Sequence, residues 1–576
     1  MFALILAFLA ACAPGSPGPG IEVDRAIVHA RELVALGPRP GDSDTSREAV
    51  AYLTRTLAEL GVHAELAPVG TMTIPAIEVM GTRFRHRSTR PTTDPNIVTR
   101  FGPPTGKALL VMAHYDTVRG SPGAIDNAAA VGVLLELART LATTPPATPV
   151  IIAFTANEEI GLVGAEALAA QLGDEVTIAI SLDVIGGTGE LSLNGASTLI
   201  GAAELDWLAD AADRAGMIVR APLAHRVVSR WWPQAERSDH GPFTRRGVRA
   251  FHLYHRGHDG ELIDRAYHTE RDDLERILPS RLAELGRLLR ALVAAPPPAR
   301  DGDGFWMPVA INTVVPRWSV ITIELVLALF AIGALARRWG PRARGGLGLV
   351  AAIGCVALAI VVGYAIERAT ASTHPAPWLH APRYHAIAMT LVLAGTLGLS
   401  TRLAARFAPW VGADRYLVVA VTLPLAIGLG FLALGAAELA WIWLVPAAAI
   451  ALAPHLGRAG LFAVAITLLP AALVAAPDQL REAAWNGFAP ATVPLVAWLV
   501  VTLLPVAAAV AWYVRHAVAH PTRPRPAGPL STLVLPLGWA LAMIIGILML
   551  VADEPPCSAV QFHEFHLGCE TRSEVR

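Results

Sequence analysis

The stretch Ala108-Leu109-Leu110-Val111-Met112-Ala113-His114-Tyr115-Asp116 decides the fold class, because six apolar residues run directly into a histidine and a carboxylate. A short apolar run that ends at polar residues is typical of a strand that is buried on both faces of a sheet. Similar runs predict further strands at 150–155, 177–182 and 250–253. The spacing between these runs leaves room for helices.

Amphipathic patterns predict those helices at 23–36, about 47–60 and 128–142. The second helix follows a polar cluster, 42–46, whose side chains are good N-cap formers. Because helices and strands alternate along the chain, we predict an α/β sandwich with a mostly parallel sheet.

Polar residues follow three of the four predicted strands. His114 and Asp116 follow the first strand, Glu158 and Glu159 the second, and Asp183 the third. In open α/β sheets the ligand crevice lies beyond the carboxyl ends of the strands, so we expect these side chains to converge. One histidine with several carboxylates is a ligand set that suits zinc.

Six short motifs resemble the M28 family of zinc peptidases, in the family's order and over roughly 23–288. That family includes aminopeptidases, carboxypeptidases of the glutamate carboxypeptidase type and glutaminyl cyclases. The motifs are His114-Tyr115-Asp116, Gly123-Ala124-Ile125-Asp126-Asn127, Asn157-Glu158-Glu159-Ile160-Gly161, Ser181-Leu182-Asp183, Ser238-Asp239-His240-Gly241-Pro242-Phe243 and Tyr267-His268-Thr269 with Asp272.

The resemblance implies a site for two zinc ions. Asp126 would bridge the two ions, His114 and Asp183 would complete the ligands of one, and Glu159 and His268 those of the other. Two such ions lower the pKa of a shared water and polarise the scissile carbonyl of a peptide.

The same resemblance assigns roles to residues that do not bind metal. Glu158 matches the general base that takes a proton from water and gives it to the leaving amine. Asp116 matches the carboxylate that orients His114 through its other ring nitrogen. Asp239 and His240 match a motif that lies near the substrate. Four other histidines match no motif and are expected to be ordinary surface or core residues: His225, His252, His255 and His258.

After Pro316 the chain changes character, because its apolar segments approach the length that crosses a bilayer. We predict an all-α polytopic membrane bundle of about eight helices. The candidate spans are 318–336, 347–366, 386–399, 416–434, 439–453, 459–476, 493–514 and 530–551. Glu324 and Glu438 lie near the outer ends of spans, where snorkelling accounts for them as well as a functional role does.

Arginine placement orients the predicted bundle, since Lys and Arg in short loops favour the cytoplasmic side. Eleven arginines lie in loops of one parity and only Arg368, Arg383 and Arg481 in the others. This places the peptidase-like part and the tail outside the cytoplasm of a bacterial-type membrane. Cys12, after an apolar leader, resembles a lipoprotein cleavage box, and Cys557 with Cys569 could form a disulfide there.

The predicted organisation has five parts. They are a signal, lipoprotein-like or anchor segment (1–20), an M28-like zinc peptidase domain (21–297), a linker (298–316), the membrane domain (317–552) and an extracytoplasmic tail (553–576).

The leading functional hypothesis is a membrane-bound zinc exopeptidase, most simply an aminopeptidase, with a peptide substrate and the lipid bilayer as partners. A carboxypeptidase, a glutaminyl cyclase with one zinc, and a transporter or scaffold with an inactive peptidase-like domain are the alternatives. The segment 226–246 is rich in arginine and could hold a substrate carboxylate or face solvent. A net charge of −1 argues against nucleic acid as a partner. The oligomeric state is left open.

Overall fold

The computed structural model of the protein describes 20–74, 77–79, 82–85, 88–194, 200–220, 238–257, 266–298, 305–306, 315–338, 361–362, 365, 388, 391–392, 395–396, 399, 413–434, 437–456, 537–538 and 540–548. The chain divides into two compact units, Met1–Pro316 with Pro556–Arg576, and Arg317–Pro555. Each unit is described by itself.

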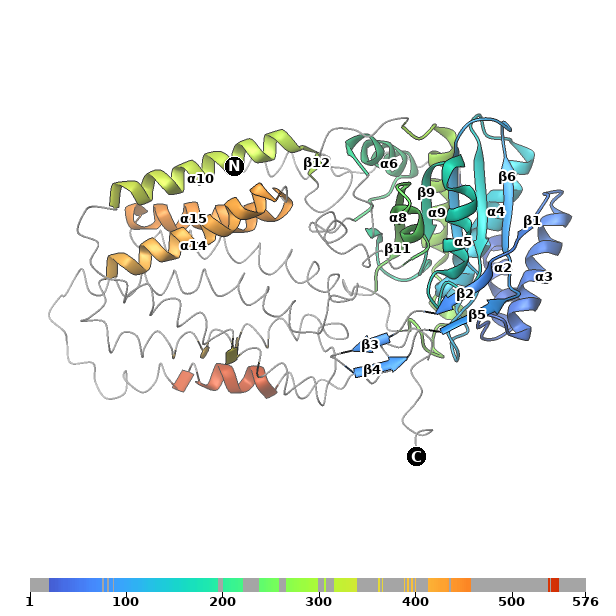
Figure 1. The fold of residues 1–576 in the computed structure, drawn as a ribbon, viewed down its shortest axis with the longest axis horizontal. Coiled ribbons are helices and arrows are strands. Elements are labelled where there is room, and N and C mark those ends of the chain that lie inside the picture. Colours follow the sequence, from blue (N-terminus) through green and yellow to red (C-terminus); the bar gives the residue numbers. More distant parts are fainter. Residues whose placement is uncertain are drawn as a thin grey trace. The chain divides into compact units, whose positions relative to one another are not determined.

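The first unit is built on a seven-stranded sheet of order β1-β6-β8-β7-β9-β11-β10 (Figure 1). The four central strands β8, β7, β9 and β11 run parallel, whereas β1, β6 and β10 are antiparallel to their neighbours. The bounds are β1 Glu65–Ala67, β6 Asn96–Phe101, β7 Ala108–His114, β8 Val150–Thr155, β9 Val176–Leu182, β10 Leu191–Asn194 and β11 Arg249–His255.

The prediction of an α/β sheet is confirmed, and the four predicted strands are the four central ones. The sheet is mixed rather than mostly parallel. The prediction differed because the sequence pattern did not reveal the three antiparallel strands. Two of these, β1 and β10, have only three and four residues, and β6 carries the charged Arg100 in its interior. Short or polar strands lack the apolar run that makes a central strand recognisable.

The register of the parallel strands brings their carboxyl ends to one edge of the sheet. His114 at the end of β7 lies opposite Thr155 at the end of β8, and Met112 lies opposite Ser181 of β9. Every residue of β7 and β8 is buried. The residues that follow these strands therefore leave the core at the same place.

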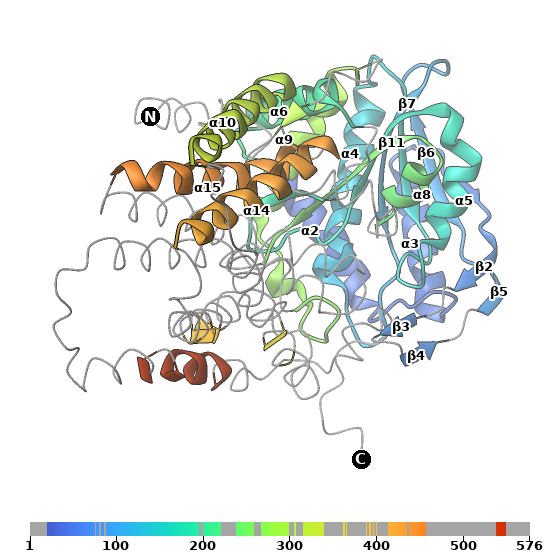
Figure 2. The ribbon, with the colours of Figure 1, turned by 60° about the vertical axis from the view of Figure 1, so that its left-hand side comes forward.

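Helices cover both faces of the sheet (Figure 2). On one face, α5 (Val163–Leu172) and α8 (His240–Arg245) pack on alternate residues of the strands. On the other face α4 (Ala129–Thr143) lies against β7 and β8, and α2 (Val23–Ala35) and α9 (Pro279–Ala294) pack on it. The predicted helix at 23–36 is α2, and the helix predicted at 128–142 is α4.

The helix predicted at about 47–60 is α3 (Asp44–Glu59), which begins three residues earlier than expected. Ser43 is its N-cap, and its side chain accepts a hydrogen bond from the backbone N–H of Ser46 at 3.0 Å. The remaining elements are β2 Gly70–Ile74 paired with β5 Ser88–Thr92, β3 Ile77–Val79 paired with β4 Thr82–Arg85, α6 Ala202–Ala215, and β12 Phe305–Trp306 paired with β13 Val315–Pro316.

The second unit contains three long described helices, α10 (Arg317–Arg338), α14 (Ala413–Ala433) and α15 (Ala437–Leu456). A core of small and branched side chains joins them, among them Ala328, Leu425 and Leu444. Small residues at such contacts let helix backbones approach closely.

Within the part of the chain that the structure describes, no helix reaches both the length and the apolarity that crossing a membrane requires. The predicted spans 318–336, 416–434 and 439–453 correspond to α10, α14 and α15. The spans at 347–366, 386–399, 459–476, 493–514 and 530–551 lie wholly or largely outside the described residues.

Several smaller predictions also fall outside the described residues: the leader with Cys12, the tail with Cys557 and Cys569, and the side chain of Glu438. Glu324 is described. It lies in α10, and its side chain is buried rather than reaching water at the helix end.

A buried carboxylate ties α2 to α4. Glu136 of α4 is inaccessible to solvent and accepts hydrogen bonds from Nε of Arg25 and Nε of Arg139, each at 2.9 Å. His29 Nε2 lies 3.8 Å from the same carboxylate. Although burial raises the pKa of Glu136, the contacts with His29, Arg25 and Arg139 outweigh it and lower the pKa to about 2.

We expect Glu136→Gln to make the fold less stable at pH 7, by at most roughly 3 kcal/mol, because two cations lose their charged partner. A carboxyl whose pKa is lowered on folding stabilises the protein above its unfolded pKa, and that contribution disappears as pH falls toward about 2. The difference between variant and wild type should therefore shrink below about pH 4.5. Hydrogen exchange of the β7 amides in urea measures it. Glu59→Gln, an exposed carboxylate of α3, is the matched control, and a constant difference across this range would contradict the prediction.

Candidate metal centre

The carboxyl ends of β7, β8 and β9 place three groups of predicted site residues together. His114 is the last residue of β7, Glu158 and Glu159 follow β8 after a two-residue turn, and Asp183 directly follows β9. All four side chains are buried. The convergence that the sequence predicted at the strand ends is present.

Asp126 stands between two groups of ligand-type side chains. Its Oδ1 lies 3.1 Å from Nε2 of His114, which is itself 3.4 Å from Oδ1 of Asp183. Its Oδ2 lies 3.2 Å from Nε2 of His268, which is 3.1 Å from Oε2 of Glu159. Each carboxylate oxygen of Asp126 therefore belongs to a different triad.

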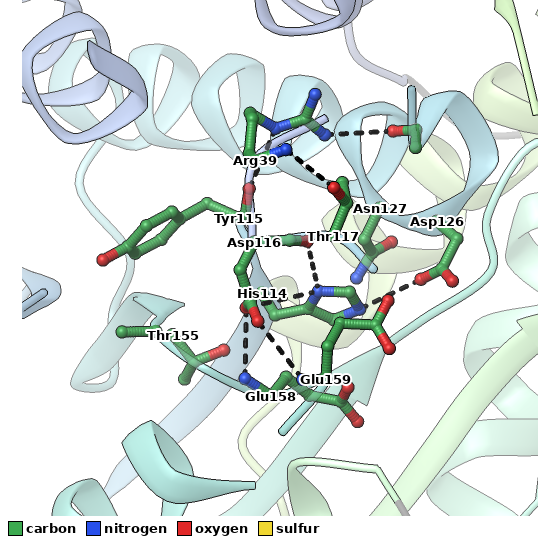
Figure 3. A network of polar contacts seen from close by, with 12 residues as sticks. Arg39, His114, Tyr115, Asp116, Thr117, Asp126, Asn127, Thr155, Glu158 and Glu159 are labelled. Atoms are coloured by element: carbon green, nitrogen blue, oxygen red, sulfur yellow. Dashed lines mark hydrogen bonds and ion pairs between the residues drawn. The ribbon is translucent and has the colours of Figure 1, made fainter. Parts of the chain in front are cut away.

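The hydrogen bonds of His114 fix which ring nitrogen faces the triad (Figure 3). Nδ1 lies 3.0 Å from the backbone carbonyl of Asp116. Because a carbonyl oxygen can only accept, Nδ1 carries the hydrogen of the neutral ring. The neutral ring would offer its Nε2 lone pair to a metal bound on the side of Asp126 and Asp183, which is the form of imidazole that binds a metal.

The Asp116 carboxylate has a different contact from the one that the resemblance implied. Its nearest approach to Nδ1 of His114 is 3.7 Å, longer than a hydrogen bond. Instead, Oδ1 accepts from the backbone N–H of Glu158 at 3.1 Å and Oδ2 from that of Glu159 at 3.2 Å (Figure 3). The carbonyl of Asp116 orients the histidine, and its carboxylate holds the Glu158–Glu159 turn.

A second buried carboxylate holds Asp126 in the same way. Oδ1 of Asp272 accepts from the backbone N–H of Ile125 at 2.8 Å, and Oδ2 accepts from that of Asp126 at 3.2 Å. Asp126 itself lies in an irregular turn of helix between Gly123 and α4, with φ −125°. Its backbone position therefore depends on Asp272, which lies far away in sequence.

Burial and neighbouring charges shift the pKa values of the site residues in opposite directions. Burial raises the pKa of Glu159 to about 8 against the effect of His268. Burial lowers the pKa of His268, but Glu159 and Asp126 more than reverse this and bring it to about 10. Burial likewise opposes the protonated form of His114, yet Asp126 and Asp183 raise its pKa well above 6.5. The cluster thus favours a bound positive charge.

The residues present fit a pair of zinc ions. Among the described residues, Oε1 of Glu159 is buried and has no hydrogen-bond partner, a costly state that binding a metal avoids. Ligands about 2.0–2.1 Å from a tetrahedral zinc lie about 3.3 Å apart, close to the distances of 3.1–3.4 Å within the two triads. Imidazole nitrogen and carboxylate oxygen are both zinc ligands.

Glu158 lies beside these triads without belonging to either. One of its carboxylate oxygens lies within 4.8 Å of ligand atoms of both His114 and Glu159. Burial raises the pKa of Glu158 well above 4.5, His114 opposes this, and Asp183 adds to it. A carboxyl group with a raised pKa is suited to taking up and returning a proton.

The structure places Asp239 and His240 next to the strand ends. The Asp239 carboxylate contacts Oγ1 of Thr155, and Ser238 is hydrogen-bonded to Ser181 of β9 at 2.7 Å. The ring of His240 stacks on His252 with centroids 5.7 Å apart. Burial raises the pKa of Asp239 to about 7 against the charge of His114. Their predicted role near a substrate remains a prediction.

Of the four histidines without a motif, His252 and His255 are buried on β11. Nδ1 of His255 accepts from the backbone N–H of Gly186 at 3.1 Å, and burial lowers its pKa to about 3, so it is a neutral core residue. His225 and His258 lie outside the described residues, as does most of the arginine-rich segment at 226–246.

Sequence reasoning missed Arg39, the largest fully buried side chain among the described residues. It also gave Asp272 no role. Arg39 stands between two prolines and two glycines, 37–41, which indicate a turn and say nothing about burial. Both residues act on backbone groups, and no sequence pattern marks such contacts.

Comparison with known proteins identifies the domain. The model of Peptidase family M28 matches residues 96–293, which include every predicted site residue. Aminopeptidase YwaD of Bacillus subtilis is 32% identical over 196 residues, covering 32% of this chain and 40% of that protein. A putative endoplasmic reticulum metallopeptidase 1-A of Caenorhabditis elegans is 29% identical over 152 residues, 23% of this chain and 16% of that protein.

A solved zinc aminopeptidase from Bacillus subtilis aligns with 49% of this chain and 98% of its own, at 17% identity and a TM-score of 0.39. The match spans less than half the length of either curated relative. The order of motifs, the family match and the sequence relatives agree, and the chain therefore carries a Peptidase family M28 domain.

Proposed function

We propose that this protein is a zinc-dependent exopeptidase that uses two metal ions and releases residues from the amino terminus of peptides. The observation that carries the proposal is the position of Asp126, whose two oxygens face separate triads at 3.1 and 3.2 Å. A carboxylate in that position is arranged to bridge two ions. His114 and Asp183 would complete the ligands of one ion, and Glu159 and His268 those of the other.

When bound, two zinc ions supply an activated water and polarise the carbonyl of the scissile bond. The chain's own residues then take up and deliver the proton. The Glu158 carboxylate, held through its backbone by Asp116, accepts the proton from water and delivers it to the nitrogen of the leaving amine.

The two-triad arrangement favours a peptidase over a glutaminyl cyclase, which the same scaffold supports with one zinc. Intact ligands and an intact base speak against a transporter or scaffold with an inactive domain. The name of the Bacillus relative favours an aminopeptidase over a carboxypeptidase.

We further propose that 317–552 embeds the protein in a bacterial-type cytoplasmic membrane, with the peptidase domain on the outer side. In support, α10 carries a face of large apolar side chains that no part of its own unit covers among the described residues, and a surface of this kind suits lipid. These are Trp318, Ile323, Leu325, Val326, Leu329, Phe330 and Ile332. The name of the worm relative, an endoplasmic reticulum metallopeptidase, points the same way.

We expect Asp126→Asn to lose both zinc ions and Asp183→Asn to lose only one, because Asp126 alone belongs to both triads. Metal content of the purified full chain after dialysis against a weak chelator measures this. Asp210→Asn, an exposed carboxylate of α6, is the control and should keep the wild-type content. An Asp126→Asn variant that retains two zinc ions would refute the bridging role.

Glu158→Gln should keep its zinc and lose turnover by about 10²–10⁴-fold, because the amide cannot take up the proton. The assay is digestion of peptides with free and with blocked ends, read by mass spectrometry. Loss of activity when only the amino terminus is blocked indicates an aminopeptidase, and loss when only the carboxyl terminus is blocked indicates a carboxypeptidase. Cyclised glutaminyl products would favour the cyclase, and unchanged turnover in the variant would exclude Glu158 as the base.

Reporter fusions test the orientation of the membrane part. A cytoplasm-active reporter in the loop that contains Arg337, Arg338, Arg342 and Arg344 should be active, and a periplasm-active reporter there should be silent. The reverse result should be found for fusions at the tail after residue 552. An outer location for the 337–344 loop would overturn the proposed topology.

A further inference from the structure

Arg39 lies in the loop between α2 and α3, and its side chain is completely buried. It stands well before residue 96, where the family match begins. A buried arginine needs partners for all its N–H groups, because an unpaired charged donor in the interior is very unfavourable. The identity of those partners shows what Arg39 holds.

All the partners are backbone carbonyls, three of them in the site loop, 115–125, which joins His114 to Asp126. Nε donates to Tyr115 at 3.0 Å, Nη1 to Leu33 at 2.9 Å, Gly37 at 3.2 Å and Pro122 at 2.9 Å, and Nη2 to Gly123 at 3.2 Å. Figure 3 shows the guanidinium above Tyr115 and the loop that follows it. Tyr115 directly follows the ligand His114, and Gly123 lies three residues before Asp126.

The backbone of Arg39 also forms hydrogen bonds with the same loop. Its N–H donates to Oγ1 of Thr117 at 2.8 Å, and its carbonyl accepts from the backbone N–H of Thr117 at 3.1 Å. One residue therefore fixes the start, the middle and the end of the segment that separates His114 from Asp126.

Asp272 completes the arrangement from the other direction. It takes the N–H groups of Ile125 and Asp126 with its side chain, and its own carbonyl accepts from Ala124 at 3.1 Å. The guanidinium of Arg39 thus holds the carbonyls of 122–123, and the side-chain oxygens of Asp272 accept from the N–H groups of Ile125 and Asp126. Burial lowers the pKa of Arg39 to about 10, against the charges of Asp272 and others, so the guanidinium stays charged at pH 7.

The chain is tightly packed around Gly123, where these contacts meet. Gly123 has φ +64°, and a Cβ built there would lie 2.5 Å from the carbonyl oxygen of Asp126 and 3.0 Å from Nη2 of Arg39. Glycine is the residue that tolerates both this conformation and this approach. A change at Arg39 is therefore transmitted to Asp126 rather than absorbed.

We propose that Arg39 is a positioning residue for the metal pair, setting the separation of His114 and Asp126 through the carbonyls of the loop between them. None of the hydrogen bonds described above joins Arg39 to the side chain of either predicted ligand. The inference rests on the proposed function, since it concerns the geometry of that same site. The planar guanidinium has five N–H groups in a fixed fork, so a lysine can replace the charge but not the pattern of contacts.

The test uses the full chain and the variants Arg39→Lys and Arg39→Met, with Arg25→Met as a matched control. Arg25 pairs with the buried carboxylate of Glu136, which is not part of the site loop. Three quantities are measured: thermal unfolding, zinc affinity by competition with a chelator, and the visible absorption of the cobalt-substituted protein, which reports ligand geometry.

We expect Arg39→Lys to fold, to bind zinc about 10-fold or more weakly, and to show an altered cobalt spectrum. Arg25→Met should lower the unfolding temperature and leave zinc affinity and the cobalt spectrum as in the wild type. Thr117→Val, a milder change at the same junction, should move zinc affinity in the same direction as Arg39→Lys.

Folded Arg39→Lys and Thr117→Val variants with wild-type zinc affinity and cobalt spectrum would overturn the inference. So would an Arg39→Lys chain that cannot fold, because Arg39 would then be purely structural. A wild type that binds two zinc ions but cleaves no peptide would contradict the proposed function. The zinc affinities of the variants would then decide the inference about Arg39. A wild type that binds no zinc would remove both.

Discussion

The structure depends on one electrostatic constraint, the burial of four carboxylates and two imidazoles at a single edge of the sheet. Asp126, Glu158, Glu159 and Asp183 crowd around His114 and His268 with little access to water. Like charges at these distances repel strongly in a medium of low dielectric. The same carboxylates raise the pKa values of His114 and His268, and a bound cation would relieve the repulsion.

Such a cluster stays assembled only if the backbone that carries it is held by other groups. Two carboxylates do this without joining the metal ligands: Asp116 binds the N–H groups of the Glu158–Glu159 turn, and Asp272 binds those of Ile125 and Asp126. Arg39 binds the carbonyls of the connecting loop. The contacts of Arg39 are charge-assisted hydrogen bonds to the main chain, which are stronger than neutral ones.

The sheet provides the common platform. Because β7, β8 and β9 are parallel neighbours in close register, their ends present His114, the Glu158–Glu159 turn and Asp183 on one side. Asp126 and His268 reach the same point from a helix start and from a turn, so the second triad is assembled across the fold rather than along one edge. The side chains of the candidate metal centre thus come from five separate parts of the chain.

The sequence by itself determined the central strands, three helices and the set of side chains that meet, because apolar runs that end in His, Asp or Glu are local patterns, and six ordered motifs are specific. It did not determine the antiparallel strands β1, β6 and β10, which are short or polar. Only the tertiary structure decided that the Asp116 carboxylate accepts from the backbone of the Glu158–Glu159 turn and not from a ring nitrogen of His114. It alone also decided that Arg39 and Asp272 hydrogen-bond to the backbone of one loop. Those contacts join side chains to backbone groups, and a backbone carbonyl or N–H is the same for every residue, so the sequence carries no record of them.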